Sequence, residues 1–288
     1  MPVKAADFTT WLKDTDRRCL VMGVLNVTPD SFSDGGLFFT DDSAIAAAEQ
    51  MYRDGADLID VGGESTRPGS ARVDPAEQIR RVLPVLRSVG RRLPVVLSVD
   101  TTRAEVARAA LDAGATVIND ISAARDDADM LPLMASSGAA AILMHMQGRP
   151  ADMQLNPAYR DVTDDVMAFL RQRLEAARDA GIPPDRILLD PGIGFGKALE
   201  HNLQLLGNLP RLAQLRQPLV VGVSRKSFIG RITGQSQPAQ RIFGTAASVA
   251  WSAANGAAIV RVHDVKAMSD VVRTIRAIQA GHLPDNSP

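Results

Sequence analysis

The sequence predicts an α/β protein folded as a single (β/α)8 TIM barrel, because eight short apolar runs alternate with eight longer segments of helical spacing along 288 residues. Glycine follows five of these helical segments, at positions 55, 114, 138, 181 and 256, where it would end a helix before the next strand. No tract rich in Pro, Gly or Ser divides the chain. Strict alternation favours a parallel sheet covered by helices, and an open doubly wound sheet is the alternative to a closed barrel.

The expected strands are the short apolar runs, most of which end at a hydrogen-bonding or charged residue. They cover residues 20–26, 58–61, 95–100, 116–119, 140–145, 187–190, 219–223 and 258–262. The expected helices cover residues 42–54, 75–89, 103–113, 127–136, 161–180, 199–208, 240–255 and 264–280. We expect residues 1–19 to form an N-terminal segment that closes the bottom of the barrel, residues 20–282 to form the barrel domain, and residues 283–288 to be a tail.

The overall composition favours a globular protein that acts on small molecules. Apolar residues make up 45% and charged residues 23%, and 32 basic against 33 acidic side chains give a net charge of -1. This balance does not indicate a nucleic acid or an anionic membrane as a partner. The single Cys19 can form no internal disulfide, and no apolar run approaches the roughly 18 residues of a membrane span. We therefore expect a cytoplasmic protein.

A glycine-rich loop follows the apolar run at residues 187–189 and begins with Asp190. It is not a nucleotide P-loop, because Pro191 and Ala198 stand where that motif needs Gly and Ser or Thr. It is not a dinucleotide-binding fingerprint either, because Lys197 replaces the third glycine. What remains is a carboxylate at a strand end, with glycines that allow the backbone to approach a ligand closely; a helix cap at Asp190 is the structural alternative.

Polar side chains stand at or just beyond nearly every expected strand end. In a (β/α)8 barrel these ends lie together at one face and form the active site. Residues two apart in a strand share a face, so Ser98 with Asp100 and Arg261 with His263 would point inward together. Taken together, the strand ends present Asn26, Glu64, Thr66, Arg67, Asp100, Asn119, His145, Asp190, Ser224, Arg225, Lys226, Ser227, Arg261 and His263.

These residue types suggest two kinds of ligand group. Carboxylates and an amide suit a flat heterocycle that presents several N–H donors. Arg261 and His263, beside the start of the helix expected near Asp264, suit a phosphate or pyrophosphate. Four scattered histidines give no metal-binding pair, but a hard ion could be held by Asn26 and substrate phosphates.

Three other features have simpler interpretations. The loops at residues 27–36 and 64–69 are polar and rich in glycine or proline, so they could close over the site. Lys197 and Arg225 are interpreted as solvated loop cations. His145 is interpreted as a strand-end histidine with its hydrogen bonds satisfied, and not as a ligand.

Six motifs in order make the chain resemble the dihydropteroate synthase family over nearly its whole length. They lie at residues 23–36, 60–69, 119–121, 190–197, 224–227 and 261–264. The resemblance implies a (β/α)8 homodimer that joins para-aminobenzoate to 6-hydroxymethyl-7,8-dihydropterin pyrophosphate and releases pyrophosphate with Mg2+. It also implies a sulfonamide target in folate biosynthesis, and we expect a dissociative substitution at the pterin methylene.

The resemblance assigns roles residue by residue. It implies that the pterin is held by Asp100, Asn119, Asp190 and Lys226. It implies a pyrophosphate site formed by Asn26 (through Mg2+), Thr66, Arg261 and His263. It implies a para-aminobenzoate site lined by Phe32, Thr66, Arg67, Pro68, Phe195 and Ser227. The residues expected to act directly in catalysis are Lys226, Arg261, His263 and Asp34.

Three rival functions remain at this point. A pterin-binding methyltransferase shares the barrel, but it should lack the first loop and the run at residues 224–227. A Schiff-base enzyme would use Lys226 as its nucleophile and needs a lysine of lowered pKa, which the neighbouring polar residues do not suggest. The presence of four residues argues against a pterin-binding subunit without activity: Asn26, Thr66, Arg67 and Lys226.

Overall fold

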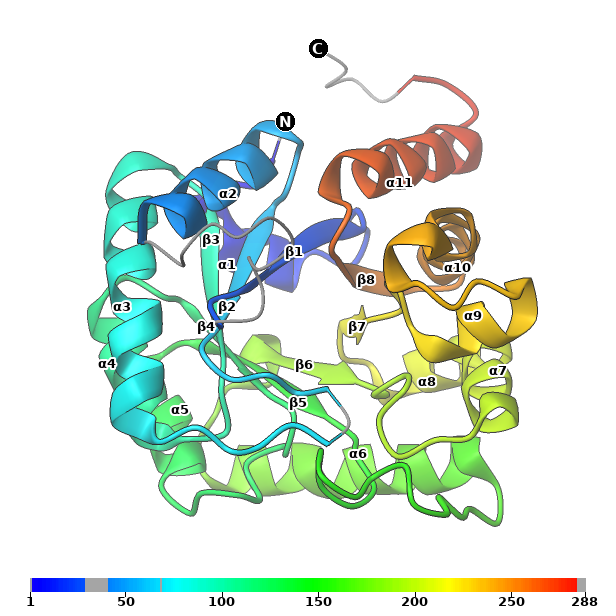
Figure 1. Cartoon of the computed structure of the whole chain (residues 1–288), viewed down its shortest axis with the longest axis horizontal. Coiled ribbons are helices and arrows are strands. Elements are labelled where there is room, and N and C mark those ends of the chain that lie inside the picture. Colours follow the sequence, from blue (N-terminus) through cyan, green and yellow to red (C-terminus); the bar gives the residue numbers. More distant parts are fainter. Residues whose placement is uncertain (1, 29–40, 68, 284–288) are drawn as a thin grey trace.

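Eight parallel strands close into a barrel in the computed structural model, which describes residues 2–28, 41–67 and 69–283 (Figure 1). Each strand pairs with the next, and the eighth pairs with the first, so the predicted (β/α)8 barrel is confirmed and an open sheet is excluded. The strands are β1 (Leu20–Asn26), β2 (Leu58–Gly62), β3 (Val96–Asp100), β4 (Val117–Asp120), β5 (Ala140–Met144), β6 (Ile187–Asp190), β7 (Leu219–Val221) and β8 (Ala257–Val262).

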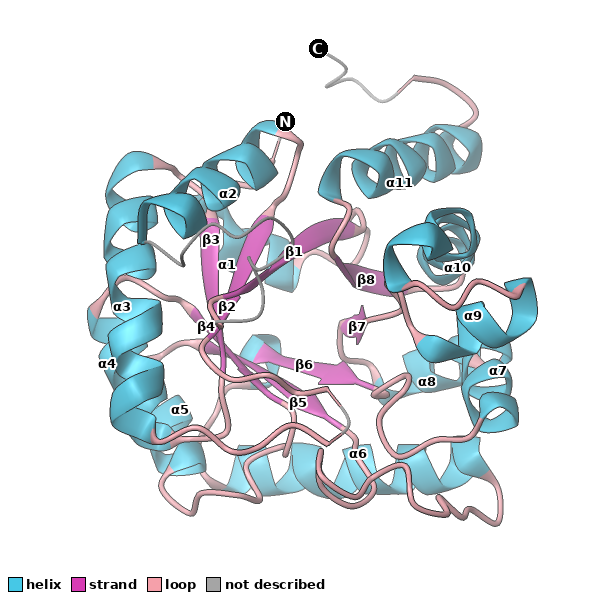
Figure 2. Cartoon of the chain, in the orientation of Figure 1, coloured by secondary structure: helices cyan, strands magenta, loops and turns pink. Residues whose placement is uncertain are grey.

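Helices surround the barrel, as the alternating pattern predicts (Figure 2). All five glycines expected to follow helices have a positive φ, for example 72° at Gly138 after α5. The eight expected helices are present as α2 (Asp41–Arg53), α3 (Pro75–Arg92), α4 (Ala104–Asp112), α5 (Met130–Ser137), α6 (Val162–Asp179), α7 (Leu199–Gly207), α10 (Ile242–Ala254) and α11 (Val265–Ala280).

Within the described ranges, three further short α-helices occur that the sequence pattern does not predict. They are α1 (Phe8–Lys13), α8 (Leu209–Leu212) and α9 (Ser227–Thr233). Helix α9 has seven residues, too few for a periodicity to stand out, and Gly230 lowers its helix propensity. It forms because Phe228 and Ile229 are buried against the rest of the protein.

The inside of the barrel is apolar at one end and polar at the other. On β3, for example, Val96, Ser98 and Asp100 point inward, whereas Leu97 and Val99 pack under the helices. Phe8, Trp11 and Leu12 of the N-terminal segment pack against the apolar end. The inward apolar side chains there are Leu20, Met22, Leu58, Val96, Val117, Ala140, Ile142, Leu188, Val220 and Ile259. The core thus fills the barrel from below and leaves the carboxyl ends of the strands to polar groups.

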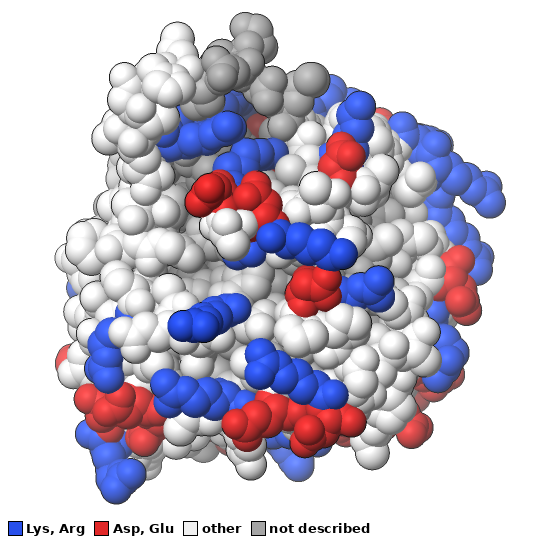
Figure 3. Space-filling view, turned by 180° about the vertical axis from the view of Figure 1, so that it is seen from behind, with Lys and Arg blue, Asp and Glu red and all other residues white. Residues whose placement is uncertain are grey.

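The surface and the helices show the features of an ordinary globular exterior. On the face opposite to that of Figure 1, basic and acidic side chains are interspersed (Figure 3). None of the helices in the described ranges is long and apolar enough to cross a membrane.

Candidate active site

A cavity of about 700 Å³ opens at the carboxyl ends of the strands. Its wall includes every predicted site residue that lies in the described part of the chain. Phe32, Asp34 and Pro68 lie outside the described residues, so nothing is said of their positions. The predicted residues that line the cavity are Asn26, Thr66, Arg67, Asp100, Asn119, Asp190, Phe195, Lys226, Ser227, Arg261 and His263.

The floor of the cavity is formed by side chains at three strand ends. Asp100 ends β3, Asn119 lies in β4 and Asp190 ends β6, and all three are buried. Burial raises the pKa of Asp100 to about 7, although the nearby Arg261 lowers it. Burial also raises the pKa of Asp190 to about 6, against the hydrogen bond from the Gly192 amide. Both carboxylates therefore favour a ligand that donates N–H groups to them.

Arg261 connects this floor to a carboxylate that the sequence did not single out. Its Nε donates to Oδ2 of Asp60 at 2.7 Å, and its Nη2 donates to Oδ2 of Asp100 at 2.8 Å. The amide nitrogen of Asn119 donates to the same Asp60 oxygen at 2.9 Å. Asp60 is completely buried, so it fixes both the guanidinium and the amide from below. Asp60 could have been identified from the sequence, because it is a charged residue inside the apolar run at 58–61.

Lys226 lies above the floor, against the ring of Phe195. Its Nζ is 4.0 Å from the ring centroid, within cation–π distance. Burial lowers the pKa of Lys226 to about 8, and Arg261 lowers it further, whereas Asp190 and Asp100 raise it. The sequence-based expectation that this lysine keeps an ordinary pKa is therefore wrong, because its chain neighbours say nothing about its desolvation.

His263 is held in a neutral form. Burial lowers its pKa to about 3, and the nearby Arg261, Arg225 and Lys226 lower it further. Oγ of Ser224 accepts a hydrogen bond from the His263 amide at 3.1 Å and lies 3.0 Å from Nδ1 of the ring. The hydroxyl proton of Ser224 can then be donated to Nδ1, which leaves the ring proton on Nε2.

The rim of the cavity carries the more exposed predicted residues. Arg67 and Ser227 are exposed, and Thr66 is half-buried. The loop that carries Thr66 and Arg67 is tied down by Glu64, whose Oε2 accepts from Nε2 of Gln78 at 2.6 Å. The loop of the rim is thus fixed by a hydrogen bond at Glu64, whereas its residue Arg67 is exposed to solvent.

Two cations that the sequence interpretation placed in solvent are held by the protein instead. Lys197 is only 3% exposed, and its Nζ lies 2.9 Å from Nδ1 of His145. Arg225 pairs with Asp264, its Nε lying 3.0 Å from Oδ2. His145 is buried with its hydrogen bond satisfied, as expected. The glycines and polar residues next to a lysine or arginine in the sequence do not show whether its long side chain extends into solvent or is buried beneath the loop.

Several lining residues were missed by the sequence interpretation. One side of the cavity is formed by members of an apolar cluster of Ile121, Met144, Met146, Met153 and Phe195. Two of its methionines, at positions 144 and 146, flank His145 after β5, and this pattern was the signal that could have identified them. The missed residues of the cavity wall include Ile121, Met144, Met153, Gln154, Pro238 and Arg241. Flat apolar contact beside a hydrogen-bonding floor suits an aromatic heterocycle.

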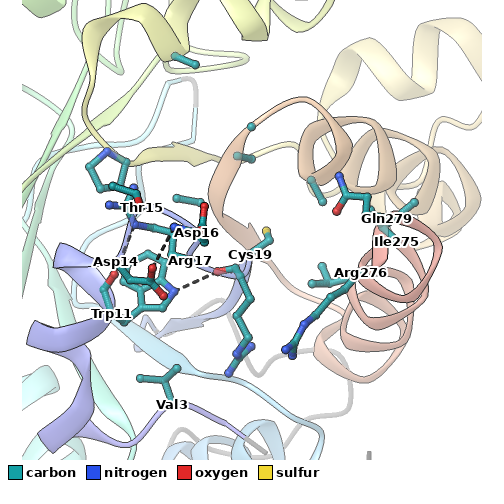
Figure 4. A pocket seen from close by; sticks show the side chains of 18 of the residues that line it. Val3, Trp11, Asp14, Thr15, Asp16, Arg17, Cys19, Ile275, Arg276 and Gln279 are labelled. Atoms are coloured by element: carbon teal, nitrogen blue, oxygen red, sulfur yellow. Dashed lines mark hydrogen bonds between the residues drawn. The ribbon is translucent and has the colours of Figure 1, made fainter. Parts of the chain in front are cut away.

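A second cavity, of about 1230 Å³, lies at the other end of the barrel (Figure 4). It is bordered by the segment around Trp11 and by α11, from which Arg276 and Gln279 reach its edge. Arg17 is engaged there by the carbonyls of Trp11 and Leu12. This second cavity lies at the amino ends of the strands, where barrel enzymes do not place their active sites. The smaller cavity at the carboxyl ends is therefore the candidate site.

The closed barrel and the polar cavity at the carboxyl ends of its strands define a (β/α)8-barrel enzyme. A model of the pterin binding enzyme family matches residues 22–263. A dihydropteroate synthase from Synechocystis sp. is 46% identical over 267 residues, which cover 93% of this chain and 92% of the relative. One from Neisseria meningitidis serogroup B is 46% identical over 264 residues, covering 90% and 92%. The chain belongs to the dihydropteroate synthase family, so the predicted transferase function in folate biosynthesis is confirmed.

Solved structures agree with this assignment. Xanthomonas albilineans dihydropteroate synthase with 4-aminobenzoic acid superposes with a TM-score of 0.87 at 46% identity, covering 91% of this chain and 94% of that one. The Yersinia pestis dihydropteroate synthase in a sulfonamide drug complex gives a TM-score of 0.87 at 45% identity, covering 91% and 95%.

Proposed function

We propose that this protein joins para-aminobenzoate to 6-hydroxymethyl-7,8-dihydropterin pyrophosphate, giving 7,8-dihydropteroate and pyrophosphate. One observation carries the proposal: buried carboxylates and an amide form the floor of the cavity that also contains Arg261, Lys226 and His263. A neutral heterocycle with N–H donors fits the floor, and a leaving anion fits the cations. Structures of related synthases were solved with 4-aminobenzoic acid and with 7,8-dihydropteroate, which supports the same pair of ligands here.

The pterin would be bound by hydrogen bonds to its N–H groups from the carboxylates of Asp190 and Asp100. Asn119 offers an amide whose orientation is set by its bond to Asp60. Lys226 would donate to the pterin from above while it remains against Phe195. The apolar side chains of Ile121, Met144, Met146 and Met153 would pack against the pterin ring.

The pyrophosphate would lie near Arg261 and the Nε2–H of His263, at the mouth of the cavity. Helix α11 begins at Val265, so the positive end of its dipole is close to the same position. The Ser224–His263 contact orients the imidazole and does not supply a nucleophile, because Ser224 is buried and its oxygen already accepts the His263 amide.

We propose Mg2+ as the cofactor, held by the Asn26 side chain and by substrate oxygens. The donor set fits this arrangement: Asn26 presents an amide oxygen in the cavity, and the described residues contain no group of three or more His, Cys, Asp or Glu that could hold a metal alone. When bound, Mg2+ would neutralise charge on the leaving pyrophosphate.

The substitution would be dissociative. Cleavage of the methylene carbon–oxygen bond leaves positive charge that the electron-rich pterin delocalises and that Asp190 and Asp100 stabilise. Arg261 and His263 stabilise the negative charge of the leaving group. The unprotonated amine of para-aminobenzoate then attacks the methylene carbon from a pocket formed by Thr66, Arg67, Phe195 and Ser227, and the proton that its nitrogen loses passes to the released pyrophosphate. Sulfonamides should compete there, as the Yersinia complex suggests.

We also propose that the protein acts as a homodimer in the cytoplasm. The neighbouring helices α7, α9 and α10 (Figure 1) expose large apolar side chains, of which Phe243 is 87% and Trp251 51% exposed, together with Leu203 and Ile232. Burying this surface against a second copy would remove it from water. The single Cys19 supports a reducing compartment.

The decisive experiment is to mix the protein with dihydropterin pyrophosphate and Mg2+, with and without para-aminobenzoate, and to follow dihydropteroate and pyrophosphate. Product that depends on para-aminobenzoate is expected. Tight pterin binding without product would instead favour a pterin-binding methyltransferase or an inactive binding subunit. Borohydride trapping of Lys226 with a carbonyl substrate would revive the Schiff-base alternative, which its lowered pKa allows.

A further inference from the structure

The loop between β6 and α7 carries Phe195 into the cavity and is fixed from behind by side chains. Three successive carbonyls in it each accept one hydrogen bond. Gly194 accepts from Nε2 of Gln154 at 2.7 Å, Phe195 from Nζ of Lys197 at 2.9 Å, and Gly196 from Oη of Tyr159 at 2.6 Å. Such pinning leaves the loop backbone little freedom to rotate.

Lys197 is the centre of this arrangement. Its ammonium group is buried and makes contacts to the Phe195 carbonyl, to Nδ1 of His145 at 2.9 Å and to the His145 carbonyl at 3.5 Å. Burial lowers the pKa of Lys197 to about 7, whereas Asp190 raises it, and the three acceptors around Nζ favour the charged form. Burial lowers the pKa of His145 to about 2, and Lys197 lowers it further, so the imidazole is neutral and Nδ1 can accept.

The backbone held by Lys197 positions the ring of Phe195. The Phe195 amide donates to the Gly192 carbonyl at 3.0 Å, so both polar groups of that residue are engaged. The ring is then in contact with the apolar cluster on one side and with Nζ of Lys226 at 4.0 Å on another. A rotation of the 195–196 peptide would move the ring out of this position.

We propose that Lys197 is a positioning residue for the second substrate, because it holds the Phe195 carbonyl so that the ring forms one wall of the para-aminobenzoate pocket. This role rests on the proposed function. Lys197 is not among the residues that line the cavity, so it acts through Phe195. Tyr159 and Gln154 contribute to the same effect from the segment between β5 and α6.

The test compares Lys197→Met with Tyr159→Phe. Lys197→Met keeps the apolar stem but removes the bond to Phe195, and it should raise the KM for para-aminobenzoate about tenfold, the size expected for a lost hydrogen bond to a charged group. The dissociation constant for dihydropterin pyrophosphate should stay within about threefold, because the floor residues keep their partners. Tyr159→Phe removes a neutral hydrogen bond and should raise the same KM less.

The control is Asp57→Asn, which disturbs a buried ion pair with Arg18 at the opposite end of the barrel. It should lower the melting temperature without changing either substrate constant. The proposal is overturned if Lys197→Met and Tyr159→Phe behave like this control, or if pterin binding weakens as much as the KM for para-aminobenzoate rises. If Lys197→Met does not fold, the KM of Tyr159→Phe for para-aminobenzoate tests the proposal by itself. A wild-type protein that forms no dihydropteroate would overturn the proposed function, and this role with it.

Discussion

Charges at the floor of the site are balanced residue by residue. Asp60 and Asp100 share Arg261, and Asp190 lies near Lys226, so the buried acids and bases come in nearly equal numbers. The two carboxylates that face the cavity have raised pKa values, whereas Asp60 lies beneath the floor and accepts hydrogen bonds from Arg261 and Asn119. Asp100 and Asp190 are therefore suited to form hydrogen bonds with a ligand, whereas Asp60 is suited to keep its bonds to the protein.

Asp190→Asn should weaken pterin binding by about 1.5 to 3 kcal/mol, because it removes a charge-assisted hydrogen bond. In the wild type, affinity should fall as the pH drops below about 6, where Asp190 becomes protonated, and this slope should be flatter in the variant. Calorimetric titration of a dihydropterin between pH 5 and 8 measures both effects. Equal affinities for the two proteins would remove Asp190 from the pterin site.

The same raised pKa affects stability in the absence of ligand. The folded protein holds a proton on Asp190 up to about pH 6, whereas the unfolded chain loses it near the ordinary value of 3.8. The contribution of Asp190 to the free energy of unfolding therefore falls as the pH rises between these values.

Asp60→Asn should reduce both stability and affinity for dihydropterin pyrophosphate, because Arg261 and Asn119 lose their shared acceptor charge. A loss of about 1 to 3 kcal/mol in the free energy of unfolding is expected. Urea unfolding and pterin titration measure the two effects. The matched control is Ser98→Ala: Ser98 lies opposite Asp60 on β3, and its hydroxyl has no hydrogen-bond partner in the described structure. If Asp60→Asn changes the free energy of unfolding and the pterin affinity as little as this control does, the proposed role of Asp60 in supporting Arg261 and Asn119 is wrong.

At the scale of elements, the loop after β6 shows why glycine is needed where the backbone comes close to another strand end. Gly192 has a φ of 67°, and a Cβ at this position would lie 1.9 Å from the carbonyl oxygen of His145. This close approach brings the end of β6 against β5 and directs the loop toward the cavity. The sequence indicates the glycines, but only the packing of β5 against β6 shows that Gly192 has no room for a side chain.

Gly192→Ala should lower the free energy of unfolding by about 3 kcal/mol or more, because backbone strain and a clash with a carbonyl act together. Gly234→Ala is the matched control. Gly234 has a φ of 74°, but no atom lies within 4 Å of its Cβ position, so only the strain of about 1 kcal/mol is expected. Chemical denaturation compares the two variants, and equal losses would contradict the importance of the contact with His145.

Elements were predicted well where burial follows a regular pattern. The runs that became β1 and β6 have the predicted bounds, because each is a continuous apolar segment between polar residues. The end of β7 was placed two residues too late, at Val223 instead of Val221, since an apolar run can leave the sheet while it stays buried. Helix α9 was missed because its seven residues are stabilised by tertiary contacts.

At the scale of the whole molecule, the barrel separates stability from chemistry. The apolar interior layers and the N-terminal Trp11 occupy one end, and the titratable groups of the candidate site occupy the other. Helices α7, α9 and α10 leave an apolar surface on the outside of the barrel. This division allows the site to contain strained and charged groups without a loss of the fold.

Phe243→Glu should convert the proposed dimer to a monomer, because a buried carboxylate without a partner opposes association. Light scattering during size-exclusion chromatography at several protein concentrations measures this change. Ile278→Glu on α11 is the control, since Ile278 is also exposed, at 70%, but lies outside α7, α9 and α10. A wild type that is monomeric at all concentrations, or a dimer unaffected by Phe243→Glu, would contradict the proposed interface.

The sequence by itself determined the barrel and most of the polar residues that line the candidate site. Alternating apolar runs require parallel strands, and parallel strands bring Asp100, Asn119 and Asp190 to one face whatever the details of the loops. Only the tertiary structure decided that Asp60 supports Arg261 and that Lys197 is buried behind Phe195. The physical reason is that a backbone pattern sets where a residue lies, whereas the direction and ionisation of a long or charged side chain depend on groups far away in the chain.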